Sequence, residues 1–406
     1  MVSPLLIVVV ALAAGFLIPL LAQIGPSSKE GGSPLASLLF FAAVAALIVI
    51  PATWLLPLAS GAADAEVFTA GVRPPLSINL RMGLVEALVL TLVNVAGLFS
   101  VLAGVRAIHA RGAAGYVLAL MVLLGANGLV LTRDLFNAFV FLEILSIGTY
   151  GIIAVDDEPK QYAAGFKYLI AGGLSSVLFL LGTVYLYRLT GTLNIDGIVT
   201  AVDEGALADA GSGGLLAIGA GFTAPFLLFA GLLIELKPFP ANGWALDTYE
   251  ASNPGVAALV SAVNATAVVM LLYKLVPIFP RPIVSTLVWV GILTFFASNL
   301  IGMRQREARR MLGYSSVAQI GLIAAVVALV ALDGRSAVYV AIAGGGLLVN
   351  HMLAKAGLFW IAGAAGTAAP AGTAAGAAAG RPERGIGPVA GVTLILLALA
   401  LVGLPP

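Results

Sequence analysis

The sequence contains no cysteine and very little charge, and each absence narrows what the protein can be. Without cysteine the chain cannot form disulfide bridges, cysteine-ligated iron–sulfur clusters or thiolate metal sites, so any redox chemistry must sit on another subunit. Lys, Arg, Asp and Glu make up only 10% of 406 residues, against about a quarter in soluble domains. With 61% hydrophobic residues and a mean hydropathy of +1.08, this composition is tenable only in lipid.

Histidine and net charge are also scarce, which excludes two further classes of function. The net charge of +1 gives no sign of a nucleic-acid partner or of an acidic partner surface. The two histidines, His109 and His351, are far apart in the sequence, and no ligand spacing suggests a metal site.

What is abundant is apolar sequence in stretches of about 20 residues, the length that crosses a bilayer. We count about 12 such segments and predict an all-α polytopic membrane protein: 4–24, 36–59, 82–105, 113–131, 135–155, 163–187, 213–236, 253–276, 283–303, 311–332, 336–364 and 386–404. The first segment has no basic region before it, so we interpret it as a transmembrane helix and not as a cleaved signal.

The connections between the segments have their own composition. Residues 61–81 contain Pro74 and Pro75 and are expected to form a loop or hairpin outside the membrane. Residues 188–212 form a polar connection, and the Ala/Gly/Pro run 363–380 is typical of a flexible linker.

Positive charge is distributed unevenly between the two sets of loops. With the N-terminus outside, inner loops carry more Lys and Arg than outer loops, mainly because of the run from Arg304 to Arg310. Lys274 is assigned to an outer loop in this orientation. We therefore expect an N-terminus outside the membrane.

A few charged residues lie within the apolar segments, where an uncompensated charge costs several kcal/mol. Glu143 is in the middle of 135–155, and Lys167 is in the next segment, which can pack antiparallel to it. A Glu143–Lys167 pair would keep both groups charged and could act as a gate, or it could be a static ion pair that fixes two helices.

The seventh segment carries two charges where it should break. Pro238 and Pro240 follow Glu235 and Lys237, and proline ends a helix by removing a backbone donor. Broken helices at membrane depth are tolerated where they line a cavity, and in transporters they mark ion sites. Glu235 and Lys237 are therefore candidate proton sites, or they solvate the rim of the broken end.

His351 and Lys355 lie four residues apart, hence on one face of a helix. An imidazole titrates near neutral pH and can pass protons on. A lone histidine is more often a satisfied core residue, but a lysine one turn away favours a proton relay.

Four stretches together resemble the antiporter-like subunits of respiratory complex I, of Mrp cation/proton antiporters and of membrane-bound hydrogenases. They are Asp134–Glu143, Phe166–Tyr168 with Tyr185–Asn194, Arg309–Gly321, and Asn350–Phe359, all in the family's order. The resemblance covers about residues 80–406 and is nearest to the Mrp D-type and complex I N-type subunits. It places Glu143 on the family's essential glutamate.

The resemblance implies two inverted five-helix repeats, each with a broken helix, and proton transfer along carboxylates, lysines and histidines near the midplane. We expect an N-terminal part at 1–112, a first repeat at 113–277 and an incomplete second repeat at 281–406. Iron–sulfur, flavin or Ni–Fe cofactors are expected only in partner subunits, and other membrane subunits, including further antiporter-like ones, are the expected partners.

The sequence departs from the family pattern at three places. Glu235 stands at the position of the family's seventh-helix lysine, with Lys237 two residues on, and Ala265, beside Asn264, stands at that of the eighth-helix lysine. The helices that follow the motif matching Gly403–Pro406 are absent. The sequence leaves open whether it is part of a longer chain, whether a neighbouring chain supplies the rest, or whether the second channel has been lost.

Three functions remain open at this point. The chain is a proton- or Na⁺-translocating subunit of a redox-driven complex in the inner membrane of a prokaryote, an Mrp-type antiporter subunit without redox partners, or a scaffold that no longer conducts. The residues expected to form the ion path are Glu143, Lys167, Glu235, Lys237, His351 and Lys355.

Overall fold

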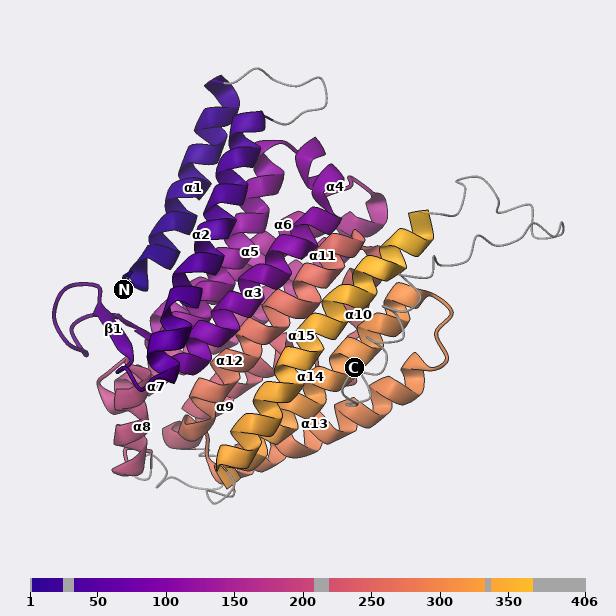
Figure 1. Cartoon of the computed structure of the whole chain (residues 1–406). Coiled ribbons are helices and arrows are strands. Elements are labelled where there is room, and N and C mark those ends of the chain that lie inside the picture. The colour runs from indigo at the N-terminus through magenta and orange to yellow at the C-terminus, as the bar shows by residue number, and fades with distance from the viewer. Residues whose placement is uncertain (1, 25–32, 208–218, 333–336, 368–406) are drawn as a thin grey trace.

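The computed structural model describes residues 2–24, 33–207, 219–332 and 337–367, which form a bundle of long helices (Figure 1). The long helices are α1 (Leu5–Ile24), α2 (Pro34–Ala59), α3 (Leu84–Ala103), α5 (Ala113–Leu131), α6 (Leu135–Ile153), α7 (Pro159–Thr190), α9 (Ala220–Glu235), α13 (Arg281–Gly302), α14 (Ala308–Leu332) and α15 (Ala337–Thr367). A further one, α11 (Pro254–Leu259), continues through a π-helical turn (Val260–Asn264) into α12 (Ala265–Leu275).

Eleven of the twelve predicted apolar segments coincide with these helices. Within the described residues, ten helices are long and apolar enough to cross a membrane, and α9 is a shorter apolar helix. The predicted segment 386–404 and the linker beyond residue 367 lie outside the described residues. The predicted all-α polytopic membrane fold is confirmed.

Short elements fill the predicted connections. The strands β1 (Ala65–Phe68) and β2 (Asn79–Met82) pair antiparallel, with Ala65 opposite Met82. They form the hairpin predicted for 61–81. The short helix α4 (Val105–Ala110) lies just before α5. The short helix α8 (Ile195–Asp203) lies within the polar connection 188–212.

The helix made of α11, the π-helical turn and α12 is the centre of the bundle. Its apolar stretch is entirely buried, whereas the long helices at the edge, such as α1, are largely exposed. A π-helical turn inserts an extra residue and redirects the side chains around it, and such turns are frequent at functional sites. Here the turn carries Ser261 and Asn264.

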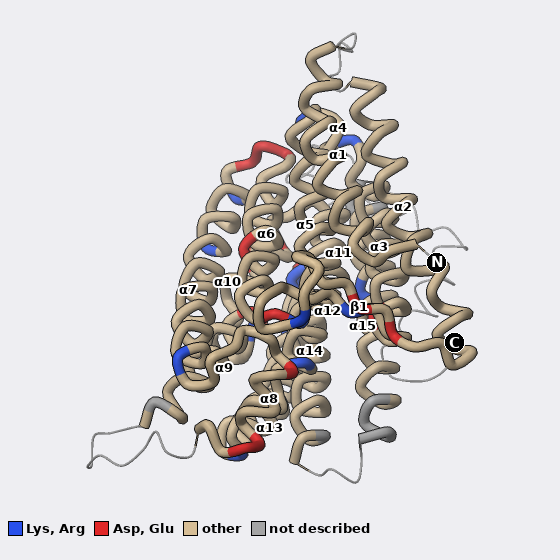
Figure 2. Tube along the Cα trace, turned by 90° about the vertical axis from the view of Figure 1, so that its left-hand side faces the viewer, with Lys and Arg blue, Asp and Glu red and all other residues tan. Residues whose placement is uncertain are grey.

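The chain start and the charged residues distinguish the ends of the bundle from its middle. The indole nitrogen of Trp54 donates to the carbonyl of Val2, so the chain begins beside the end of α2, near β1 (Figure 1). Viewed from the side, many of the Lys, Arg, Asp and Glu positions gather near the ends of the helices, and a few lie at mid-height (Figure 2). The mid-height charges are the ones whose burial needs an explanation.

Lys274 is not in a loop, as the charge distribution had suggested, but buried at the end of α12. Only 4% of it is exposed, and its ammonium donates to the carbonyls of Leu129, Val130 and Thr132 at the end of α5. The last carbonyls of a helix have no partner within it. Lys274 donates hydrogen bonds to these carbonyls. The assignment of Lys274 to an outer loop is therefore wrong, because a lysine near the end of a span can also be buried.

The seventh predicted span breaks where the prolines predicted. α9 ends at Glu235, and the chain resumes as α10 (Gly243–Ala251) after a turn in which Lys237 has a φ of +58°. The expected boundaries near residues 112 and 277–281 fall between helices, before α5 and α13. The division into two inverted repeats remains a prediction.

Candidate functional site

A hydrogen-bonded chain of buried side chains runs from the broken helix into the centre of the bundle. The ammonium of Lys237 donates to the hydroxyl of Tyr249 on α10 at 3.3 Å. That hydroxyl lies 3.4 Å from Ser316 Oγ on α14, which lies 2.9 Å from Ser261 Oγ in the π-helical turn. Each of these side chains is buried, so the chain is screened from lipid and solvent.

His351 on α15 continues this chain. Its Nε2 lies 3.1 Å from the carbonyl oxygen of Ser261, and because a carbonyl only accepts, Nε2 carries a proton. Its Nδ1 lies 2.9 Å from Gln319 Oε1 on α14. Four residues along, the ammonium of Lys355 donates to Ser315 Oγ at 2.6 Å. The relay face predicted for His351 and Lys355 is therefore buried against α14 and the central helix.

The lysine side chain at the break is held by aromatic rings as well as by a hydrogen bond. Lys237 Nζ lies 5.4 Å from the centre of the Tyr249 ring and 6.0 Å from that of Trp244. Cation–π contacts of this kind stabilise a desolvated ammonium. Lys237 thus lies inside the protein and not at a solvated rim.

A second cluster of buried polar side chains is centred on Asn264, in the same π-helical turn as Ser261. Asn264 is next to the position that the resemblance aligns with the family's eighth-helix lysine. Asn264 donates to Thr149 Oγ1 on α6 at 2.6 Å and to the Tyr168 hydroxyl on α7 at 3.4 Å. Its Oδ1 is buried and has no hydrogen-bond partner among the described residues. An uncharged amide thus lies next to Ala265, the residue that the resemblance aligns with that lysine.

The two candidate carboxylates lie on α6 and α9, two helices that both pack against α7. Glu235, the last residue of α9, is 4% exposed, whereas Glu143 on α6 is partly exposed. The two are close enough for the charge of Glu143 to act on the carboxyl group of Glu235.

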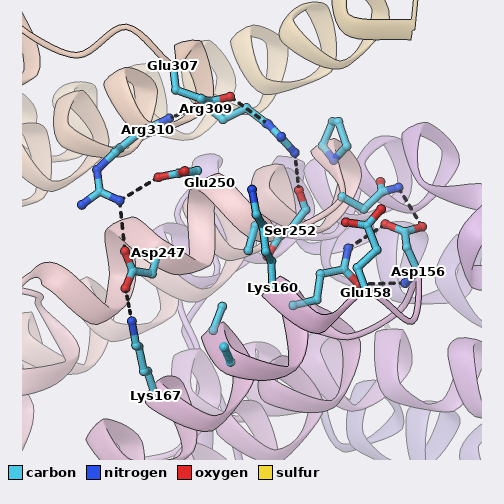
Figure 3. Close-up of a pocket in the computed structure, with 16 residues that line it drawn as sticks. Asp156, Glu158, Lys160, Lys167, Asp247, Glu250, Ser252, Glu307, Arg309 and Arg310 are labelled. Carbon is cyan, nitrogen blue, oxygen red and sulfur yellow. Dashed lines mark hydrogen bonds and ion pairs between the residues drawn. The ribbon is translucent and has the colours of Figure 1, made fainter. Parts of the chain in front are cut away.

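The expected pairing of Glu143 with Lys167 is wrong. The ammonium of Lys167 bonds Asp247 on α10 at 2.5 Å, and its side chain is 54% exposed. Asp247 also accepts from Arg310, which in turn bonds Glu250 (Figure 3). Gly165 faces the carbonyl of Tyr150 and Gly172 faces Ser146, so the register of α7 on α6 places Lys167 nearer the end of the bundle than Glu143.

These ion pairs line a charged cavity of about 490 Å³ at that end of the bundle (Figure 3). Its walls come from the start of α7, from α10 and from the start of α14. The charged or polar lining residues include Asp156, Glu158, Lys160, Lys167, Asp247, Glu250, Glu307, Arg309 and Arg310. The cavity gives water access to α10, the helix that carries Tyr249.

Sequence reasoning missed several residues of the buried chain. Tyr249, Ser261 and Gln319 are polar residues in apolar helices, and this could have marked them. Within the described residues, no group of three or more His, Asp or Glu could hold a metal ion.

Comparison with known proteins gives the same family that the sequence motifs indicate. Residues 132–406 match the family described as NADH:quinone oxidoreductase/Mrp antiporter, TM. NADH-quinone oxidoreductase subunit N of Desulforudis audaxviator is 33% identical over 256 residues, which are 61% of this chain and 47% of that protein. The chain spans about half the length of the curated relatives it matches.

Two solved structures share this fold. A chain of the membrane-bound sulfane sulfur reductase, an archaeal respiratory membrane complex, superposes with a TM-score of 0.84 at 27% identity, covering 99% of this chain and 78% of that one. A chain of the Mrp complex from Dietzia sp. DQ12-45-1b superposes with a TM-score of 0.79 at 25% identity, covering 98% and 71%. This chain therefore belongs to the NADH:quinone oxidoreductase/Mrp antiporter transmembrane family.

Proposed function

We propose that this chain conducts protons through the membrane as one subunit of a multi-subunit energy-converting complex. The observation that carries the proposal is the buried chain Lys237–Tyr249–Ser316–Ser261–His351. From Tyr249 to Ser261 the links are hydroxyl groups, each of which can accept a proton on one side and release one on the other. His351 joins the end of this chain through the backbone carbonyl of Ser261, which accepts from its Nε2 and holds the imidazole beside the path. An intramembrane polar chain is costly to keep, which supports a functional role.

The chemistry of the chain favours protons over Na⁺. A sodium ion needs several converging oxygen ligands, whereas Lys237 and Lys355 place ammonium groups beside the path. Protons need only hydrogen-bond contacts of the length found here. Coupling to Na⁺ elsewhere in the complex is compatible with this arrangement.

The proposed complex is redox-driven and located in the inner membrane of a prokaryote, with the N-terminus outside. Relatives called NADH-quinone oxidoreductase subunit N and the chain of an archaeal respiratory complex support a redox assembly. Electron carriers, whether iron–sulfur, flavin or Ni–Fe, would belong to partner subunits, and further antiporter-like subunits would be neighbours in the membrane. The similarity to the Mrp complex supports the alternative, an antiporter without redox partners.

Mass spectrometry of the complex that purifies with this chain in mild detergent separates these alternatives. Subunits that bind flavin or metal clusters would support the redox assembly, and purely membrane partners would support the antiporter. A scaffold that has lost conduction stays a third candidate, because Asn264 and Ala265 stand where the family has a charge.

Conduction itself is tested in vesicles that contain the purified complex, with a pH-sensitive dye as the readout. Ser316→Ala removes the hydroxyl that links Tyr249 to Ser261, and we expect proton uptake to fall by at least tenfold. Ser298→Ala is the matched control, because Ser298 is a buried serine on α13 that bonds Asn242 outside this chain. Equal proton uptake by the two variants would favour the scaffold.

A further inference from the structure

One carboxylate on α10 ties that helix to both of its neighbours. Asp247 Oδ2 accepts from the ammonium of Lys167 on α7 at 2.5 Å, and its Oδ1 accepts from Arg310 Nη1 on α14 at 3.0 Å (Figure 3). The same Nη1 donates to Glu250, one turn further along α10, at 2.7 Å. α10 packs against both α7 and α14, so these bonds hold a short helix from two sides. The four residues form the α10 clamp.

Tyr249 leaves α10 on a different side from the clamp residues. With 3.6 residues per turn, Asp247 and Glu250 share one face of the helix, and Tyr249 is about 160° round the helix from Asp247. Asp247 and Glu250 line the charged cavity, whereas Tyr249 is 1% exposed and joins Lys237 to Ser316. α10 therefore carries the clamp on its cavity side and a link of the buried chain on its inner side.

One face of α14 meets α10 at three successive turns. Arg310, Gly313 and Ser316 follow one another at intervals of three residues, so they lie along one face of α14. Arg310 makes the clamp, and a Cβ added at Gly313 would lie 2.9 Å from Cδ2 of the Tyr249 ring. Ser316 Oγ lies 3.4 Å from the Tyr249 hydroxyl. The ion pairs at the first contact thus set the height of α10 along α14, and with it the distance at the third.

The contact between Tyr249 and Ser316 is the one that depends most on this height. Its 3.4 Å exceeds the 2.9 Å between Ser316 and Ser261. Hydrogen bonds between hydroxyl groups are usually about 2.5–3.0 Å long, so a shift of α10 by about 0.5 Å towards α14 gives a strong bond and the same shift away breaks it. A small displacement of α10 therefore decides whether a proton can pass this link.

We propose that the α10 clamp positions the Tyr249 hydroxyl against Ser316, which makes Asp247 and Arg310 positioning residues for proton transfer along the buried chain. This inference rests on the proposed proton conduction. The side chains of Asp247 and Arg310 are each 30% exposed, and ion pairs at such exposure contribute little to stability. Their loss should therefore move α10 without unfolding the bundle.

Substitutions of Arg310 test the clamp in vesicles that contain the purified complex. Arg310→Met removes both ion pairs, and we expect proton uptake to fall at least fivefold while the melting temperature stays that of the wild type. Both bonds come from one nitrogen, and a lysine ammonium has three donors, so Arg310→Lys should restore uptake to within about twofold of the wild type. Wild-type uptake in Arg310→Met would overturn the proposal, as would an equal loss in Arg310→Lys.

The matched control is an arginine of similar exposure in an ion pair away from α10. Arg81 on β2 bonds Asp64 at 2.6 Å, and its side chain is 38% exposed. Arg81→Met should leave proton uptake at the wild-type level, because the β1–β2 hairpin does not hold Tyr249. A loss as large as that in Arg310→Met would overturn the positioning role of the clamp.

A double variant shows whether the clamp acts through the link between Tyr249 and Ser316. Ser316→Ala already removes that link, so adding Arg310→Met should lower the residual uptake no further, whereas an additional fivefold loss would overturn the proposal. Reduced uptake in Ser316→Ala with normal uptake in Arg310→Met would refute the positioning alone. Normal uptake in Ser316→Ala would instead refute the proposed conduction along this chain, and the positioning with it.

Discussion

Tyr249 is the residue through which the broken helix is joined to the centre of the bundle. Its ring stacks on Phe359 with ring centres 5.4 Å apart, and its hydroxyl links Lys237 to Ser316. Tyr249→Phe keeps the stacking and removes only the proton-carrying group. We expect proton uptake by vesicles to fall by at least tenfold, with assembly of the complex unchanged.

The control for this substitution is another buried tyrosine. Tyr116 is 1% exposed, and its hydroxyl bonds His109 Nδ1 at 2.9 Å. Within the described residues, neither of the two contacts the buried hydrogen-bonded chain that contains Tyr249. Tyr116→Phe loses one hydrogen bond, worth about 1 kcal/mol, and should leave proton uptake intact. Equal loss in both variants would show that the effect of Tyr249→Phe is one of stability.

Lys274 illustrates a buried charge with a structural role. Lys274→Met keeps the apolar stem but leaves three buried carbonyls without a donor, and we expect the free energy of unfolding to fall by about 1–3 kcal/mol. The melting temperature of the purified complex measures this loss. Lys160→Met, at an exposed position on α7, should melt like the wild type.

At the residue scale, the sequence predicted which charged residues are buried inside the bundle better than it predicted their partners. Apolar surroundings marked Glu235, Lys237, His351 and Lys355, because charge within an apolar run is a local property of the sequence. The partner of Lys167 could not be predicted, since it depends on how α7 slides along α6 and α10. That register is fixed by close contacts at glycines, which no local pattern reports.

At the scale of elements, glycines decide how closely the helices around the path approach one another. A Cβ at Gly231 on α9 would lie 2.6 Å from the carbonyl oxygen of Ser175 and 2.8 Å from the amide nitrogen of Phe179. Gly231→Ala must therefore push α9 away from α7, and it would displace Glu235 one turn later. We expect a loss of about 1–3 kcal/mol in stability, as for other overpacked contacts.

Thermal melting of the purified complex reports this displacement. Gly243→Ala at the start of α10 is the control, because a Cβ there meets nothing within 4 Å. A Gly231→Ala variant with wild-type melting would contradict the close α7–α9 contact.

The element boundaries themselves were largely predictable. Hydrophobic length and the pair Pro238 and Pro240 placed the spans and the break, because span length and proline are local determinants. The π-helical turn at Val260–Asn264 was not predictable, since nothing in that apolar sequence distinguishes it from an α-helix. The extra residue of this turn lets Ser261 bond α14 while Asn264 bonds α6 and α7.

At the scale of the whole molecule, the buried chain must connect to water on the correct side of the membrane. The charged cavity lies at one end of the bundle, with Arg309 and Arg310, and the β1–β2 hairpin lies in the connection expected at the opposite end. The excess of arginine in the expected inner loops predicts that the cavity faces the inner side. Proton entry through the cavity would then be from the inner side.

The absence of cysteine makes this orientation directly measurable, because a single introduced cysteine has no background. Ala70→Cys in the hairpin connection and Glu158→Cys at the cavity are both at exposed positions. With a membrane-impermeant thiol reagent, we expect Ala70→Cys to react in intact cells and Glu158→Cys only in inverted vesicles. The opposite pattern would place the cavity outside and reverse the direction of proton entry that the arginine distribution implies.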